Sequence, residues 1–236
     1  MHQQIYSRAP RRLDPIQAAA RGQCKSAPAV PKCRKRGKHI VTDSDELAQL
    51  LAQRKAATGP DRAAVDAAIH ARFGRMQAIM FTDLVGFSRL VEAFGILHFL
   101  QLIDESESLF LPLIHQHGGS CLKREGDSLL AVFDAPAQAL AAARAMLAAT
   151  DAANPGRLPE ERIEVCIGLG YGRVLRVGQH EVWGAEVNAA SKLGEEIAHR
   201  GEVLVTEDFH AAVPGEPFTE CAKIFDARSV FQLRTD

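Results

Sequence analysis

The sequence has 236 residues, of which 47% are hydrophobic and 24% charged, and its formal net charge at pH 7 is -1. This balance predicts one globular domain of ordinary size with an appendage, and it excludes a general attraction to nucleic acid or anionic lipid. No stretch approaches the ~20 apolar residues of a membrane span, and the first residues lack the apolar core of a secretory signal. Five scattered cysteines without a CxxC pair argue against zinc and favour reduced thiols in the cytoplasm.

Residues 1–42 form a basic segment. Its first forty residues contain ten Lys or Arg against a single acid, Asp14, and few large apolar side chains. Such a composition predicts a disordered tail. The cluster at 32–38 is compatible with contact to nucleic acid or membrane, but a solvated tail is the favoured interpretation, so we expect no specific nucleic-acid partner.

Two helices are predicted next, at 43–57 and 61–75. Each begins with Asp, and Thr58-Gly59-Pro60 separates them. Their apolar stripes are Leu47, Leu50 and Leu51 on the first helix and Val65, Ile69 and Phe73 on the second. We expect this helical lead-in, 43–76, to pack on the main domain, 77–236, or on a partner subunit.

Strands and helices alternate from residue 77 onward. The predicted strands are 78–83, 120–125, 128–133, 162–170, 173–177, 202–206 and 228–233, and the predicted helices are 88–115, 135–151 and 184–199. The order β-α-β-β-α-β is typical of the ferredoxin-like group, an α+β sandwich with helices on one face of the sheet.

Two aspartates stand at the ends of predicted strands. Asp83 closes a buried strand, where it is either a helix cap or turn residue or a functional carboxylate, and Asp127 lies on a hairpin turn. The predicted topology brings both to one end of the sheet, where paired carboxylates share a proton or bind Mg²⁺ or Mn²⁺. Gly86-Phe87-Ser88 leads into a helix whose N-terminus attracts phosphate. This combination indicates nucleotide chemistry.

Four segments, in order, resemble the class III nucleotide cyclase catalytic domain. They are FTDLVGFS at 81–88, KREGD at 123–127, IGLGYG at 167–172 and WGAEVNAAS at 183–191. The resemblance covers about 77–233 and implies the cyclase fold.

The resemblance also implies how metal and phosphate are held. Asp83 and Asp127 match the metal-binding aspartates, which hold two Mg²⁺ or Mn²⁺ ions together with the backbone carbonyl matching Leu84. One ion activates the ribose 3′-hydroxyl, and the other offsets charge on the phosphates. Gly86, Phe87 and Ser88 match the phosphate-facing turn.

Base selection is assigned by the same resemblance. Lys123 matches the purine-selecting lysine, and Glu181 stands where the family has Asp or Thr. A lysine donates to adenine N1 and a carboxylate accepts from the N6 amino group. The alternative is that Lys123 and Glu181 are ordinary surface charges. Trp183 is expected to be a packing residue.

The remaining matches concern the ribose and the phosphates. Asn188 matches the ribose-orienting asparagine, and Lys192 replaces the transition-state arginine, which removes its bidentate geometry. Lys223 is a weak match to a triphosphate-binding lysine, because the usual glycines around it are missing.

The resemblance therefore implies a cytoplasmic adenylate cyclase of intracellular signalling, which converts ATP to 3′,5′-cyclic AMP and pyrophosphate. The two site halves would come from opposite subunits of a head-to-tail homodimer. The alternatives are a low-activity nucleotide-binding module, because of Lys192, and a guanylate cyclase, because Lys123 can also donate to guanine O6.

Overall fold

The computed structural model describes residues 42–225 and 228–234, with side chains omitted for 222–225. The predictions for the basic tail and for the Lys223 side chain therefore lie outside the described residues. Within the described part, no helix has both the length and the apolar character that crossing a membrane requires.

The lead-in is a pair of helices, α1 (Asp43–Ala56) and α2 (Gly59–Phe73). Thr42 caps α1 by accepting a hydrogen bond from the Asp45 backbone N–H, and the Asp45 carboxylate accepts one from the Thr42 backbone N–H. The pair packs on the main domain, which is the first of the two surfaces expected for it, through a cluster that comprises Leu47, Leu50, Val65, Ile69, Phe73, Leu175 and Val177. The chain then passes directly from α2 into β1 (Gly74–Leu84), so the helix predicted to reach residue 75 ends at Phe73.

Eight strands of the described residues form one sheet, in the order β2-β3-β1-β4-β6-β8-β7, with β5 paired to β4. After β1, the strands are β2 (Ser120–Glu125), β3 (Ser128–Phe133), β4 (Val165–Val177), β5 (Glu181–Trp183), β6 (Val203–Thr206), β7 (Phe218–Phe225) and β8 (Arg228–Leu233). The β2-β3-β1-β4 part has the ferredoxin-like order, with β1 and β3 antiparallel neighbours. The predicted α+β ferredoxin-like core is confirmed.

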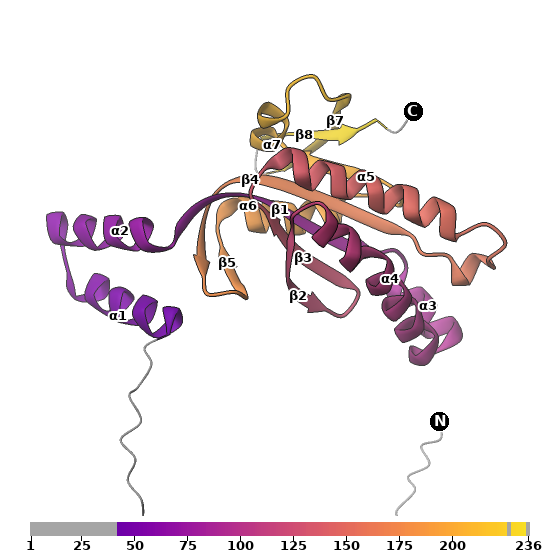
Figure 1. Cartoon of the computed structure of the whole chain (residues 1–236), viewed down its shortest axis with the longest axis horizontal. Helices are drawn as coiled ribbons and strands as arrows, with labels where there is room; N and C mark the ends of the chain where they lie inside the picture. The colour runs from indigo at the N-terminus through magenta and orange to yellow at the C-terminus, as the bar shows by residue number, and fades with distance from the viewer. Residues whose placement is uncertain (1–41, 226–227, 235–236) are drawn as a thin grey trace, which may run out of the picture. The chain divides into compact units, whose positions relative to one another are not determined.

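Helices cover both faces of the sheet, whereas the sequence predicted one. The main apolar core joins β1 and β3 to α4 (Ile96–Gln116), α5 (Pro136–Ala153) and α7 (Glu207–Ala212). Figure 1 shows α5 lying along this face. On the opposite face, Val187 and Ala190 of α6 (Ala185–Lys192) pack with Ile79 and Val174. A short π-helix, η2 (Leu193–Ile197), continues α6.

Glycine explains two further differences from the prediction. The helix predicted at 88–115 is two helices, α3 (Phe87–Phe94) and α4, because Gly95 adopts a φ of 86°, which other residues rarely adopt. The strand predicted to stop at residue 170 continues to Val177, because Gly170 and Gly172 make room for α6 instead of forming a turn. A 3₁₀ turn, η1 (Pro159–Glu161), precedes β4.

Candidate active site

Asp83 is the penultimate residue of β1 and does not cap a helix, since the residue preceding α3 is Gly86. The Ser128 hydroxyl of the neighbouring strand β3 donates a hydrogen bond of 2.8 Å to Asp83 Oδ1. Burial raises the pKa of Asp83 to about 6; the Ser128 hydrogen bond opposes this shift, and the negative charges of Asp127 and Glu195 add to it. Asp83 is therefore a carboxylate whose ionised form the protein itself does not fully compensate.

Asp127 lies in the β2–β3 turn, directly before Ser128, where Gly126 adopts a φ of 60°. The pKa of Asp127 is also raised by burial, partly offset by a hydrogen bond from its own backbone N–H. The two half-buried carboxylates thus share one end of the sheet, where burial disfavours the charge of both and the charge of Asp127 further disfavours that of Asp83. A divalent cation would relieve both effects, and an all-oxygen donor set suits Mg²⁺ or Mn²⁺.

The protein supplies only part of a coordination shell here. Among the described residues, no group of three or more His, Cys, Asp and Glu side chains is arranged to hold a metal. The backbone carbonyl of Leu84 adjoins Asp83 in sequence and is a further oxygen at the same strand end. Magnesium commonly completes such a shell with water and substrate phosphates.

A third acid, Glu195, lies near this site and was not predicted from the sequence. Glu195 lies on η2, which crosses β1 so closely that a Cβ on Gly194 would be 2.9 Å from the Phe81 carbonyl oxygen. The Glu195 charge acts on Asp83 as a result. No local sequence signal predicts this approach, because it depends on the π-helical turn after Lys192.

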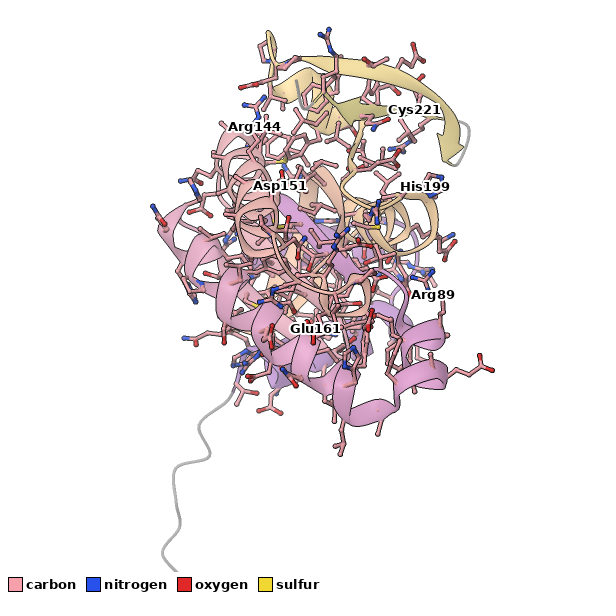
Figure 2. All side chains as sticks on the ribbon, turned by 90° about the vertical axis from the view of Figure 1, so that its right-hand side faces the viewer. Arg89, Arg144, Asp151, Glu161, His199 and Cys221 are labelled. Atoms are coloured by element: carbon pink, nitrogen blue, oxygen red, sulfur yellow. The ribbon has the colours of Figure 1, made fainter. Side chains whose placement is uncertain are left out.

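The turn after β1 presents free backbone donors. Gly86, with a φ of 93°, precedes α3, and no side chain caps the first N–H groups of that helix, which belong to Phe87, Ser88 and Arg89. Arg89 folds back over the turn, so that its Nη2 would be 3.4 Å from a Cβ on Gly86. Figure 2 labels this arginine on α3. Arg89 was not predicted as a site residue, although the sequence shows a cation three residues after Gly86.

Lys123 and Glu181 both line a hollow of about 510 Å³ between β2 and β5. A β-bulge at Cys121–Lys123 places Lys123 opposite Leu130. The Lys123 side chain is 45% exposed, with its Nζ 3.6 Å from Glu125 Oε1. Trp183 lines the same hollow and is 59% exposed, so the prediction of a packing role does not hold within this chain.

Arg176 holds the turn between β4 and β5 that leads into Glu181. Its guanidinium donates hydrogen bonds to the backbone carbonyls of Gln179, at 2.8 Å, and of Glu181, at 3.4 Å. The position of Glu181 is therefore fixed from the backbone, while its carboxylate stays available at the hollow.

Asn188 and Lys192 are exposed side chains four residues apart on α6, hence on one face of that helix. Asn188 N–H bonds to the Gly184 carbonyl at 3.3 Å, which begins the helix. The strand β7 carries Lys223, whose side chain lies outside the described residues. The walls of the Lys123–Glu181 hollow include none of Asp83, Asp127 and Asn188.

Comparison with known proteins gives a consistent result. Residues 72–230 match the family model described as the adenylate and guanylate cyclase catalytic domain. The chain is 33% identical over 142 residues to a protein named putative adenylate cyclase 3 from Rhizobium meliloti, covering 60% of this chain and 24% of that protein. It is 34% identical over 136 residues to an adenylate cyclase from Streptomyces coelicolor, covering 57% of this chain and 33% of that one. The chain thus spans a third or less of those relatives.

Solved structures agree on the fold. A crystal structure titled adenylate/guanylate cyclase/hydrolase from Silicibacter pomeroyi superposes with a TM-score of 0.57 at 30% identity and covers 69% of this chain and 98% of that chain. A bacterial light-regulated adenylyl cyclase gives a TM-score of 0.57 at 22% identity, with coverage of 68% and 90%, which supports the fold alone.

Proposed function

Because this chain belongs to the family of adenylate and guanylate cyclase catalytic domains, we propose that it is an adenylate cyclase, which converts ATP to 3′,5′-cyclic AMP and pyrophosphate. We choose ATP over GTP as the substrate because Lys123 and Glu181 line the same hollow. A lysine from β2 and a carboxylate from β5 that line the same hollow supply the donor and the acceptor that complement adenine N1 and N6.

In the proposed reaction, the ribose 3′-oxygen forms a bond to the α-phosphorus, the bond from that phosphorus to the β-phosphate oxygen breaks, and pyrophosphate and a proton are released. Two Mg²⁺ or Mn²⁺ ions bound at Asp83, Asp127 and the Leu84 carbonyl would activate the 3′-hydroxyl and offset the phosphate charge. The attacking oxygen belongs to the substrate, so the protein's task is to position the substrate and to stabilise charge.

The chain's own residues have distinct tasks in this scheme. The backbone N–H groups of Gly86, Phe87 and Ser88 and of the α3 N-terminus bind phosphate oxygens. Asn188 orients the ribose, and Lys192 places a positive charge beside the transferring phosphoryl group. Lys223 would bind the triphosphate.

We further propose a head-to-tail homodimer in which one subunit supplies Asp83 and Asp127 and the other supplies Lys123, Glu181, Asn188 and Lys192. This proposal is supported by the walls of the Lys123–Glu181 hollow, which include neither Asp83 nor Asp127. The two groups of residues therefore do not line one pocket within a single chain. A second copy related by a two-fold axis would bring the two halves together twice, to give two equivalent sites.

The decisive test is product analysis with manganese and either ATP or GTP. We expect cyclic AMP from ATP, a higher kcat/KM for ATP than for GTP, and a loss on the order of 100-fold for ATP in Lys123→Met, because that variant leaves adenine N1 without its hydrogen-bond donor. Lys55→Met, which removes an exposed lysine of α1, is the matched control. A preference for GTP in the unmodified protein would show a guanylate cyclase instead.

The low-activity alternative, which Lys192 motivates, needs a binding readout that does not depend on turnover. Trp183 is the only tryptophan of the sequence, and it lines the base hollow. Its fluorescence should therefore change when 3′-deoxy-ATP binds, since this analogue lacks the attacking hydroxyl. A fluorescence change without any cyclic product from ATP would identify a nucleotide-binding module.

A further inference from the structure

Glu186 is a buried carboxylate that the proposed reaction does not use. It lies on α6 with 5% of its surface exposed, and among the residues whose burial is described it is the only buried acid. A buried carboxylate is costly unless it is paired and hydrogen-bonded. Its surroundings must therefore compensate that charge.

Three elements contribute partners to Glu186. The Thr206 hydroxyl donates to Oε2 at 2.7 Å, and the Tyr171 backbone N–H of β4 donates to the same oxygen at 3.2 Å. Arg228 at the start of β8 lies 3.4 Å from Oε1 and also 3.7 Å from Asp208 Oδ2. Thr206 in turn caps α7 by accepting from the Phe209 N–H. One carboxylate thus ties α6 to β4, to β8 and to the start of α7.

The strand β4 has glycines at the two positions that lie against Glu186, namely Gly170 and Gly172. A Cβ on Gly170 would be 2.7 Å from the Glu186 backbone oxygen and 3.0 Å from Oε2, and a Cβ on Gly172 would be 2.8 Å from Glu186 Cγ. The 2.7 Å and 2.8 Å distances are shorter than ordinary Cβ contacts, so a side chain at either position would force Glu186 to move. The glycine-rich strand β4 and the buried carboxylate therefore form one fitted contact.

Glu186 points away from the side of α6 that faces substrate in the proposed reaction. With about 100° of rotation per residue, Glu186 lies roughly 200° around the helix from Asn188, whereas Asn188 and Lys192 are only about 40° apart. Glu186 is buried, while Asn188 and Lys192 are exposed. It can affect them only by fixing the helix that carries all three.

We propose that Glu186 is a positioning residue of the cyclase reaction, whose buried carboxylate fixes α6 against β4 and β8 and thereby sets where Asn188 and Lys192 stand. The inference rests on the proposed function. The charge matters as well as the shape, because one carboxylate oxygen accepts from neutral donors and the other faces the Arg228 guanidinium.

The test compares kcat and KM for Mn-ATP in Glu186→Gln, Arg228→Gln and the double variant. In Glu186→Gln, the amide oxygen can still accept from Thr206 and Tyr171, but the amide nitrogen then faces Arg228. We expect kcat to fall on the order of tenfold with KM changed less than about threefold, since small misplacements of positioned groups are costly. The double variant, which removes both charges, should recover a large part of kcat.

Arg200→Gln is the matched control. The pair Arg200–Glu164 has a distance of 2.6 Å and side-chain exposures of 64% and 17%, and it resembles Arg228–Glu186, with 54% and 6%, in joining an exposed arginine to a largely covered acid. Arg200→Gln should lower stability but leave kcat near the wild-type value. Circular dichroism at the assay temperature must show every variant folded.

A double-mutant cycle separates positioning from a purely structural role. If Glu186 acts through Asn188, Glu186→Gln should cost much less activity in an Asn188→Ala background than in wild type. Additive losses, or an unchanged kcat in folded Glu186→Gln, would overturn the inference. A wild-type protein that makes no cyclic nucleotide would instead contradict the proposed function, and the positioning role with it.

Discussion

At the scale of single residues, the Asp83 carboxylate holds its proton more tightly than an ordinary aspartate does. The pKa of Asp83 is about 6 in the folded chain against an ordinary value of 3.8. The folded state therefore binds this proton more tightly than the unfolded state does, so Asp83 lowers stability as the pH rises from about 4 to about 6, and the full cost remains above that range.

The first prediction follows from the raised pKa of Asp83, which makes its ionised form destabilising. In metal-free protein at pH 7.5, Asp83→Asn should raise stability by about 1 kcal/mol, after allowance for the partial exposure of the carboxylate, or by about 2–4 °C in Tm. The gain should vanish near pH 4, and cyclase activity should be lost at all pH values. Thermal unfolding of Asp83→Asn and of Asp151→Asn, an exposed aspartate of α5 (Figure 2), checks this. A lower Tm for metal-free Asp83→Asn at pH 7.5 would contradict it.

The second prediction concerns Arg89. Because its guanidinium lies over the Gly86 turn, we expect it to pair with the triphosphate. Arg89→Gln should raise KM for ATP about five- to tenfold, with a smaller effect on kcat. Steady-state kinetics of Arg144→Gln, which changes an arginine of α5 that pairs with Glu216, gives the comparison. Equal KM values for ATP in the two variants would show that Arg89 does not bind the triphosphate.

At the scale of elements, the contact between β4 and α6 determines where half of the candidate site lies. Gly170→Ala would place a Cβ 2.7 Å from the Glu186 backbone oxygen, so α6 must move away from the strand. We expect a stability loss of about 2 kcal/mol or more and a fall in kcat of at least tenfold.

Gly156→Ala is the control for Gly170→Ala. Gly156 has a φ of 82° and nothing within 4 Å of an added Cβ, so this change costs only backbone strain of about 1 kcal/mol. Measuring urea unfolding and kcat for both variants separates strain from displacement of α6. Similar kcat values for the two variants would mean that the position of α6 on β4 does not determine activity.

The elements that the sequence predicted well are those with local signals. Gly126-Asp127 marks a hairpin turn, and the bounds of β2 and β3 are as predicted, 120–125 and 128–133. The helix α7 was missed, although Thr206 followed by two acids is a capping signal. The three-residue strand β5 is too short for any periodicity to reveal it.

The residues of the candidate site also fall into those that the sequence predicts and those that it does not. The meeting of Asp83 with the β2–β3 turn could be predicted, because strand order alone brings them together. The approach of Glu195 could not, because it requires the π-helix to cross β1 at Gly194. The partners of Glu186 come from residues 15 to 42 positions away in sequence, and no local pattern encodes them.

At the scale of the whole molecule, the proposed homodimer makes a quantitative prediction. Asp83→Ala and Lys192→Ala should each be inactive, since each damages both sites of its own dimer. After equal amounts are mixed and allowed to exchange subunits, half of the dimers should be mixed, each with one intact site, which gives about a quarter of wild-type activity. Activity assays on the mixture, with native mass spectrometry to count mixed dimers, test this. Mixed dimers without activity would rule out sites shared in this way.

The strand that carries Lys123 is also an edge of the sheet. Among the described strands, β2 pairs only with β3, so its outer backbone N–H and C=O groups face away from the sheet. Open edges of this kind invite strands of other molecules and lead to aggregation, which charged side chains oppose. Lys123, Arg124 and Glu125 stand in a row on this edge and are exposed. Colloidal stability and the proposed recognition of the base therefore depend on the same short stretch, and a variant designed for another nucleobase must still keep charge on this edge to resist aggregation.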